Sequence, residues 1–408
     1  MNSIELISYS SYFKEILVSN IKDNDTKPFN IYTPLINKYL IKTIKKKSPL
    51  LDIYDNLEFC NYLENKKKIN AKEFSYINDF YFIPKININN KCLEYNHPLV
   101  EEKLLKNLSK YQHINPSILI APKQDKNNCW FNTAFMIFFI SDLGKKFSKY
   151  FRQFCITGKL DNVEITNKLI RISLFYLNIY IDSCIQGSIY SMYLNSNFLI
   201  NRIYNTFPKQ PYIKKEDETG CGIYYYHNLI SSIRLNHTSY FVPIYKFTIG
   251  KNNINSYKNI ENNSYVFNNS TPSSTPSSKN SYSKSFYNYP EIINQYPDIL
   301  LIFINENVHF QKKMNFKLNN IDYYLDSIVI QYLEKNHVCC CITINKEFYL
   351  YDGATYSSLI PFKWNKYLNS KVNINIILNI KTNPEIESKE NNNINFSKSI
   401  QYLVYYRI

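Results

Sequence analysis

The apolar positions of the chain follow two patterns, and the first predicts helices. Residues 129–143, CWFNTAFMIFFISDL, are apolar on nearly every side, which is typical of a helix that is buried all round. This segment follows a short apolar stretch, SILIAP, and a polar loop, KQDKNN. Further helices are predicted over 162–182 and around 227–234. The part of the chain from residue 116 to about residue 234 is therefore expected to be mainly helical.

The second pattern predicts strands, because β-branched and aromatic residues gather in short runs that are separated by Asn and Lys turns. SYFVPIYKFTI is the first of these runs, and the others lie after residue 296. Helices followed by an antiparallel sheet indicate an α+β fold. The predicted strands cover residues 239–249, 297–305, 323–333, 337–344, 348–353 and 400–408.

Two further segments have a different texture. Residues 252–290, with NNSTPSSTPSSKNSYSKS at the centre, are rich in Ser, Thr, Pro and Asn and show no hydrophobic period. Such composition is typical of a disordered segment, and we expect an insertion, since strong strands resume after it. Residues 1–115 are Lys-rich and contain no motif that carries chemistry. We therefore treat them as an N-terminal region of unassigned role.

Composition invites a nucleic-acid interpretation and then weakens it. Lys plus Arg outnumber Asp plus Glu by 48 to 33 in 408 residues, for a formal charge of +15, which is a common electrostatic footprint of nucleic-acid binding. The lysines are nevertheless spread along the chain, Arg is rare, and no RNA-binding signature is present. Lys, Asn, Ile, Tyr and Phe are also the residues that an AT-rich genome inflates. A coding bias spread over the whole chain is therefore the favoured explanation of the positive charge, and nucleic acid stays open as a partner.

Cysteine usage and hydropathy predict the compartment. The chain has 9 cysteines without the spacing of a secreted disulfide framework, which favours a reducing environment. The first twenty residues contain Glu5 and Lys14 and do not resemble a signal peptide. The longest apolar run, 129–140, is shorter than the roughly 20 residues that span a bilayer. We expect an intracellular, cytoplasmic protein without a membrane partner.

Cys129 is the first candidate for chemistry. It opens the buried helix directly after a polar loop, and a helix N-terminus favours the reactive thiolate. The alternative is that Cys129 is simply a small core residue. Gln124 lies five residues earlier, where its amide could donate to an oxyanion together with the backbone N–H of Cys129. Its alternative is an ordinary loop residue.

His337 and Asp352 are linked by strand register. If 337–344 and 348–353 form a hairpin across an even-numbered turn near Asn345 and Lys346, Ile344 faces Glu347. His337 and Asp352 then lie on one face as diagonal neighbours, within side-chain reach. The carboxylate could orient the imidazole toward Cys129, as in a nucleophile, base and orienter. An odd-numbered turn would separate them, leaving His337 a strand-end residue and Asp352 a turn residue.

No cofactor is expected. Cys339, Cys340 and Cys341 would alternate faces of a strand and could not converge on one metal ion, and no CxxC pair exists. Gly220 and Gly222 do not open a strand-to-helix phosphate loop.

Two segments resemble the signature boxes of the ubiquitin-specific proteases. QDKNNCWFNTAFMIFF resembles their Cys box, with Cys129, Trp130 and Asn132 at matching positions and Gln124 at that of the family's oxyanion Asn. HVCCCITINKEFYLYDGA resembles their His box, which begins with the catalytic His and ends in the Asp. The chain departs from the family pattern at Gln124 and Trp130, and in having Asn336 where a Gly normally precedes the His.

The resemblance covers residues 116–408 and implies a papain-like fold without zinc-binding fingers, most similar to compact versions from large DNA viruses. It implies a thiol protease that cleaves after the C-terminal Gly-Gly of ubiquitin or a ubiquitin-like modifier. Cys129 would be the nucleophile, His337 the base and acid, Asp352 its orienter and Gln124 the oxyanion donor. Two alternatives stay open: a papain-like endoprotease that processes polyproteins, and a non-catalytic basic protein that binds nucleic acid or serves a structural role.

Overall fold

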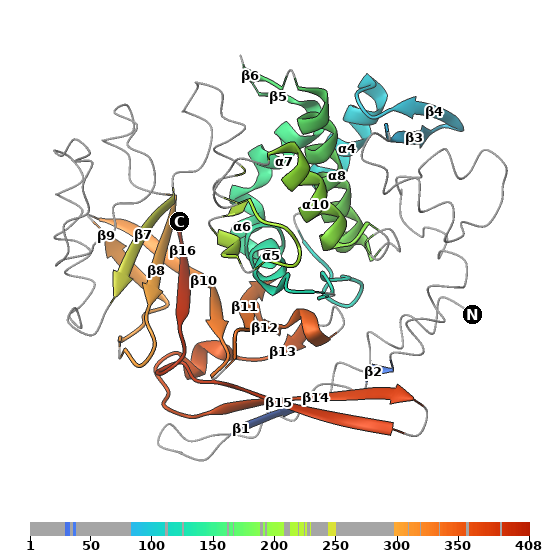
Figure 1. Cartoon of the computed structure of the whole chain (residues 1–408). Helices are drawn as coiled ribbons and strands as arrows, with labels where there is room; N and C mark the ends of the chain where they lie inside the picture. Colours follow the sequence, from blue (N-terminus) through green and yellow to red (C-terminus); the bar gives the residue numbers. More distant parts are fainter. Residues whose placement is uncertain are drawn as a thin grey trace.

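The computed structural model describes residues 83–110, 113–207, 213–229, 244–249 and 298–408, with short gaps inside these ranges, and the backbone of two short strands within 29–37. The predicted insertion at 252–290 lies outside the described residues. Helices form one lobe and a large sheet forms the other, with α5 (Cys129–Phe135) between them (Figure 1). This order of helices before sheet confirms the predicted α+β fold.

The helical lobe surrounds α8 (Lys168–Gln186), whose residues from Arg171 onward are all buried. Helix α8 begins later than the sequence predicted. Asn167 accepts hydrogen bonds from the N–H groups of Leu169 and Ile170 and so caps it, and a small hairpin occupies the preceding residues. The other helices are α4 (Pro98–Lys110), α5 (Cys129–Phe135), α6 (Asp142–Phe147), α7 (Lys149–Thr157) and α10 (Ser196–Thr206), and the hairpin is β5 (Lys159–Leu160) with β6 (Val163–Glu164).

The predicted helix over 129–143 is divided in two. After α5 the chain widens into a π-helical turn, η3 (Met136–Ile140), and stops at Ser141. The Ser141 hydroxyl donates to the Ile137 carbonyl at 2.7 Å and accepts from the Gly144 N–H at 3.1 Å. One serine thus ends the first helix and starts α6. The helix predicted around 227–234 lies almost entirely outside the described residues.

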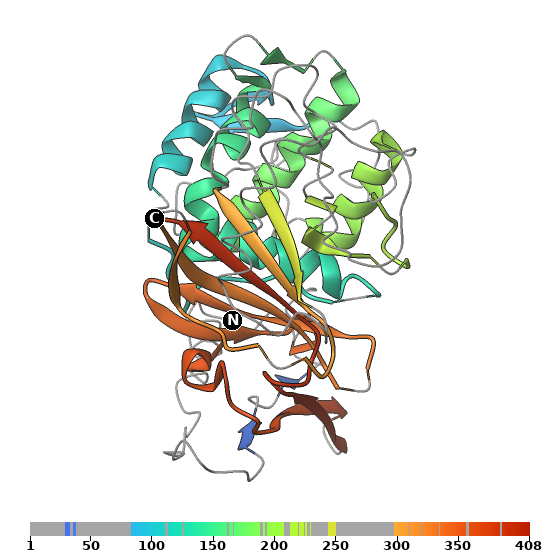
Figure 2. The ribbon, with the colours of Figure 1, turned by 90° about the vertical axis from the view of Figure 1, so that its left-hand side faces the viewer.

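The large sheet has the strand order β13-β12-β11-β10-β16-β8-β7, with β9 paired to β10. It is antiparallel as predicted, except that the edge strand β7 runs parallel to β8. Figure 2 shows the helices gathered above one side of this sheet. The strands are β7 (Ile244–Ile249), β8 (Ile299–Ile304), β9 (Asn315–Leu318), β10 (Ile321–Gln331), β11 (Val338–Ile344), β12 (Glu347–Tyr351), β13 (Leu359–Pro361) and β16 (Gln401–Arg407).

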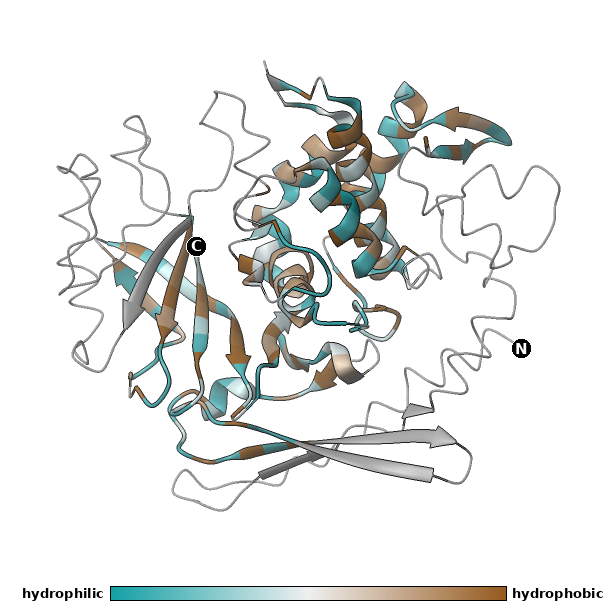
Figure 3. Ribbon diagram, in the orientation of Figure 1, coloured by the Kyte–Doolittle hydropathy of each residue, from teal (hydrophilic) through white to brown (hydrophobic). Residues whose placement is uncertain are grey.

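Both faces of the central strands are buried, which explains their nearly continuous apolar runs. Cys340 and Ile342 pack into the core under the helices, whereas Cys339 and Cys341 pack into a second core on the opposite face. The cysteine triplet therefore alternates faces, as the sequence predicted. Apolar residues recur along the helices and along the strands of the sheet (Figure 3). The second core also includes Trp364 of the 3-10 turn η7 (Trp364–Tyr367) and the first residues of β14.

A second, smaller sheet crosses the bottom of the molecule in Figure 1. The hairpin of β14 (Ile374–Asn383) and β15 (Ile386–Ile394) forms its centre, and the N-terminal strands β1 (Phe29–Tyr32) and β2 (Ile36–Asn37) pair in parallel with β14. Part of the N-terminal region is thus joined to the C-terminal half through backbone pairing.

Residues 83–110 belong to the helical lobe. They comprise the hairpin of β3 (Lys85–Ile88) with β4 (Lys91–Glu94) and then α4. Ile86, Val100 and Leu104 are fully buried in the core that contains α8. Glu101 of α4 pairs with Arg171 of α8 at 2.8 Å.

No helix among the described residues is long and apolar enough to cross a membrane. Cys92 is disulfide-bonded, whereas the other seven described cysteines are not.

Candidate active site

Cys129 is the first residue of α5, as predicted, and only 9% of its surface is exposed. The preceding residue, Asn128, makes no capping hydrogen bond with its side chain. That side chain is instead fully buried and donates to Ser196 at 3.0 Å and to Asn197 at 2.6 Å. Its oxygen accepts from Asn132 at 3.2 Å. Asn128 therefore anchors the start of the nucleophile helix to α10, a function the sequence pattern did not reveal.

A second loop clasps the segment around Cys129. Lys126 pairs with Glu216 at 2.8 Å, the Asn127 amide donates to the Asp217 carbonyl at 3.1 Å, and the Trp130 indole donates to the Glu218 carbonyl at 3.1 Å. We call residues 213–222 the clasp loop. Its two glycines permit this close packing, because a Cβ on Gly222 would lie 1.9 Å from the Trp130 carbonyl oxygen. Gly220 and Gly222, which formed no phosphate-loop pattern in the sequence, thus serve a packing role.

The hairpin of β11 and β12 has the predicted even register. Ile344 faces Glu347 and Cys340 faces Tyr351. The two turn residues, Asn345 and Lys346, have φ of 51° and 65°, as expected of a tight two-residue hairpin turn with left-handed central residues. The carboxylate of Asp142 accepts both turn N–H groups, at 2.9 and 2.8 Å. The hairpin is therefore fastened at its tip to the first turn of α6.

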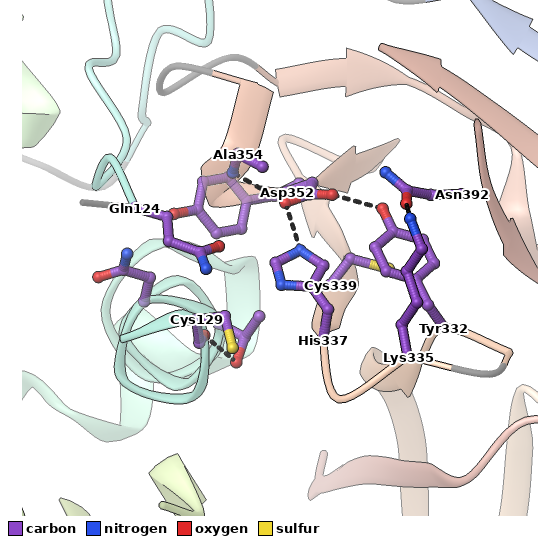
Figure 4. Close-up of polar contacts among 12 residues, drawn as sticks. Gln124, Cys129, Tyr332, Lys335, His337, Cys339, Asp352, Ala354 and Asn392 are labelled. Atoms are coloured by element: carbon purple, nitrogen blue, oxygen red, sulfur yellow. Dashed lines mark hydrogen bonds and ion pairs between the residues drawn. The ribbon is translucent and has the colours of Figure 1, made fainter. Parts of the chain in front are cut away.

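His337 and Asp352 meet at the other end of this hairpin. The imidazole Nε2 lies 2.8 Å from Asp352 Oδ1. The other ring nitrogen, Nδ1, is directed toward the side on which Cys129 lies (Figure 4). Cys129 lies close enough to the imidazole to contribute to the rise in the pKa of His337. The structure therefore brings together Cys129, His337 and Asp352 from three separate elements.

The electrostatics of this cluster favour a charged imidazole. Burial alone would lower the pKa of His337, but the charge and hydrogen bond of Asp352, with a contribution from Cys129, raise that pKa to about 10. Burial would also favour neutral Asp352, yet the charge of His337 and hydrogen bonds from His337, Tyr332 and a backbone N–H hold the pKa of Asp352 below its usual value. An imidazolium next to an ionised carboxylate is thus the stable state near neutral pH.

Tyr332 completes the surroundings of this pair. Its hydroxyl donates to Asp352 Oδ2, and its ring stacks on His337 with centroids 5.0 Å apart and planes at 16°. Tyr332 was not among the site residues predicted from the sequence. The pairing of Gln331 with Val338 places Tyr332 opposite His337, so the β10–β11 register was the signal that could have identified it. A cavity of about 340 Å³ opens beside Tyr332, lined also by Glu306, Lys335 and Asn336.

Gln124 lies in the loop that crosses the start of α5. Its backbone N–H donates to the Gly353 carbonyl at 3.0 Å, and its side-chain amide donates to the Lys126 carbonyl at 3.1 Å. Its side chain extends into the space between the start of α5 and His337 (Figure 4). The loop before Cys129 is therefore tied directly to the residue after Asp352.

Among the described residues, no group of three or more His, Cys, Asp or Glu side chains could hold a metal ion.

No protein-family model and no curated protein matches this chain. Solved structures with a similar backbone include the SAGA Ubp8/Sgf11/Sus1/Sgf73 DUB module bound to ubiquitin aldehyde. That comparison gives a TM-score of 0.43 and 9% identity, and it covers 99% of this chain and 95% of that chain. An essential yeast splicing factor has a TM-score of 0.39 and 9% identity, and the match covers 79% of this chain and 83% of that one. Similarity at this level concerns overall architecture alone, so a function has to be inferred from the residues around Cys129.

Proposed function

We propose that this chain is a cysteine isopeptidase that hydrolyses the bond after the C-terminal Gly-Gly of ubiquitin or a ubiquitin-like modifier. The convergence of Cys129 with the hydrogen-bonded pair of His337 and Asp352 (2.8 Å) supports the thiol chemistry. A nucleophile at a helix start, a base beside it and a carboxylate behind the base form the arrangement that activates a thiol. The resemblance of both sequence boxes to ubiquitin-specific proteases supports the substrate.

Before substrate binds, the thiol proton of Cys129 passes to Nδ1 of the neutral His337 imidazole; in the first step of the reaction, the resulting thiolate attacks the isopeptide carbonyl carbon. Since the pKa of His337 is about 10, the imidazole holds this proton throughout the neutral range. Asp352 accepts from Nε2, which fixes the ring so that Nδ1 faces the sulfur. The result is a thiolate–imidazolium pair that is ready before substrate arrives.

The tetrahedral intermediate places a negative charge on the former carbonyl oxygen. The backbone N–H of Cys129 and the side-chain amide of Gln124 would donate to it, since the Gln124 NH2 group has a second N–H besides the one that donates to the Lys126 carbonyl. Collapse breaks the C–N bond while His337 gives its proton to the departing lysine amine, and a thioester to Cys129 remains. Water then attacks this thioester and gives a proton to His337. The C–S bond breaks, which releases the carboxylate product and restores the thiolate–imidazolium pair.

Labelling with an electrophile attached to the C-terminus of ubiquitin tests the proposal. We expect covalent labelling of the full chain and its complete loss in Cys129→Ala. Cys221→Ala is the matched control, because Cys221 is half-buried and lies outside the cluster of Cys129, His337 and Asp352; it should label as the wild type does. Absence of labelling by ubiquitin and by ubiquitin-like modifiers would contradict the proposal.

Two further assays separate the alternatives. Cleavage of di-ubiquitin but not of a generic peptide panel is expected of the isopeptidase, whereas the reverse result would indicate a papain-like endoprotease. An inert Cys129 together with nucleic-acid binding that weakens steeply with salt would indicate the non-catalytic basic protein.

A further inference from the structure

Tyr332 contacts both members of the His337–Asp352 pair in three ways. Its hydroxyl donates to Asp352 Oδ2, which leaves Oδ1 for His337. Its ring lies nearly parallel to the imidazole, at 16°. Its backbone N–H donates to the His337 carbonyl at 2.9 Å. One side chain and one backbone group therefore fix the position of the imidazole and the orientation of the carboxylate together.

The surroundings of Tyr332 leave it little freedom. Only 2% of its surface is exposed, and it follows directly after β10, opposite His337 in the ladder with β11. The face of the imidazole that stacks on Tyr332 is closed to water, while Cys129 and Tyr332 lie on different sides of His337 (Figure 4). A buried carboxylate stays ionised only when hydrogen bonds compensate its lost hydration. Tyr332 donates to Oδ2, whereas His337 and the Ala354 N–H contact Oδ1.

We propose that Tyr332 is a positioning residue of this site: its ring fixes the plane of His337, and its hydroxyl holds Asp352 in the orientation that accepts from Nε2. The role in turnover rests on the function proposed above. The contacts themselves exist without substrate, so part of the test does not depend on activity.

The hydroxyl has an electrostatic consequence that a purely structural tyrosine would lack. Its hydrogen bond to Asp352 is stronger when His337 is neutral, because the carboxylate charge is then uncompensated. The hydroxyl therefore stabilises the neutral-imidazole state more than the charged one and limits the rise in the pKa of His337. Removal of the hydroxyl should raise the pKa of His337 further and should also raise the pKa of Asp352.

Tyr332→Phe and Tyr332→Leu separate the two contacts. The Phe variant keeps the stacked ring and loses the hydrogen bond, and we expect kcat/KM to fall about tenfold with KM nearly unchanged. The Leu variant also loses the stacking and should fall about tenfold further. Tyr405→Phe is the matched control: Tyr405 is a buried tyrosine of β16 whose hydroxyl donates to the Lys313 carbonyl at 2.7 Å, far from Asp352.

The decisive readout is the NMR titration of the His337 imidazole in the full chain, compared with the basic limb of the kcat/KM profile. Both should move to higher pH in Tyr332→Phe and stay in place in Tyr405→Phe. An unchanged His337 titration in Tyr332→Phe, or an equal loss of kcat/KM in both Phe variants, would overturn the proposal. If the wild type reacts with no ubiquitin-like electrophile, the proposed function fails, while the imidazole titration still decides whether Tyr332 sets the state of His337 and Asp352.

Discussion

The two sides of the candidate site are built by different means. His337 and Asp352 stand on a β-hairpin whose ladder and two-residue turn allow one register. Cys129 stands at the end of an irregular loop that is held by side-chain contacts to the clasp loop and to α10. A ladder fixes every side chain by alternation, whereas a loop is placed only by the sum of its individual contacts. The hairpin side should therefore tolerate changes outside the catalytic residues better than the nucleophile side.

A shared element couples the two sides. Asp142 lies just beyond the π-helical turn that follows α5 and accepts both N–H groups of the hairpin turn. At the opposite end, the Gln124 N–H donates to the Gly353 carbonyl. The hairpin is thus fastened to the nucleophile segment at both ends, which fixes the direction in which the imidazole meets the thiol.

The largest effect is expected on the hairpin side, from Asp352→Asn. The carboxylate raises the pKa of His337 from 6.5 to about 10, and a neutral amide cannot. We expect kcat/KM at neutral pH to fall on the order of 10³-fold, as is typical for orienting carboxylates. The basic limb should move down from near pH 10 toward the ordinary histidine range, which a pH profile of kcat/KM would show.

Asp322→Asn is the control for that profile. Asp322 belongs to β10 of the same sheet, and its side chain is 47% exposed and pairs with Lys317 at 3.5 Å. This variant should keep the wild-type rate and basic limb. A basic limb that stays near pH 10 in Asp352→Asn would show that another group raises the pKa of His337.

The same pair predicts how stability depends on pH. The folded pKa of His337 lies above its unfolded value, so the imidazolium stabilises the fold fully below the unfolded pKa. That contribution is lost as the pH rises through about 10.

On the nucleophile side, Gln124→Ala tests the oxyanion donor. Removal of one such donor typically costs about 10²-fold in kcat, and KM should change little because the charge develops only after attack. Asn127→Ala is the comparison, since Asn127 lies in the same loop and its amide helps to hold that loop by donating to the Asp217 carbonyl. Equal losses in the two variants would show that the loop conformation matters rather than the Gln124 amide.

Asn128→Ala should have a smaller effect on rate and a clear effect on stability. It removes the amide that binds Ser196, Asn197 and Asn132. The buried groups of Ser196 and Asn132 lose this partner, which costs about 1–3 kcal/mol of unfolding free energy. Denaturant unfolding measures the loss, and kcat/KM should fall with it because Cys129 is the next residue.

Asn107→Ala serves as the comparison for Asn128. Asn107 is a buried asparagine of α4 in the same lobe, and its replacement should leave kcat/KM unchanged. A variant of Asn128 that stays as stable as the wild type would contradict the anchoring role.

The contrast between the two sides also explains what the sequence could predict. The positions of His337 and Asp352 followed from register arithmetic, because alternation along a strand is fixed. The burial of α5 followed from its apolar surface. The clasp loop, the Asn128 anchor and the stop at Ser141 could not be predicted, since each depends on contacts between residues far apart in the sequence. Tyr332 lies between these two cases in predictability. It follows the end of β10, and the register of β10 with β11 would have placed it opposite His337.

The smallest expected effect concerns the hairpin turn, where Lys346 has φ of 65°. A residue with a Cβ is strained in this conformation, so Lys346→Gly should raise the unfolding free energy by about 0.5–1 kcal/mol. The backbone N–H that donates to Asp142 is retained, and kcat/KM should therefore stay at the wild-type value. Asn345→Gly is the informative partner, because it also relieves positive φ but removes the amide that donates to the Ile114 carbonyl. If both Lys346→Gly and Asn345→Gly destabilise the protein, the turn is held by side chains rather than by its backbone, and the hairpin side would resemble the Cys129 side after all.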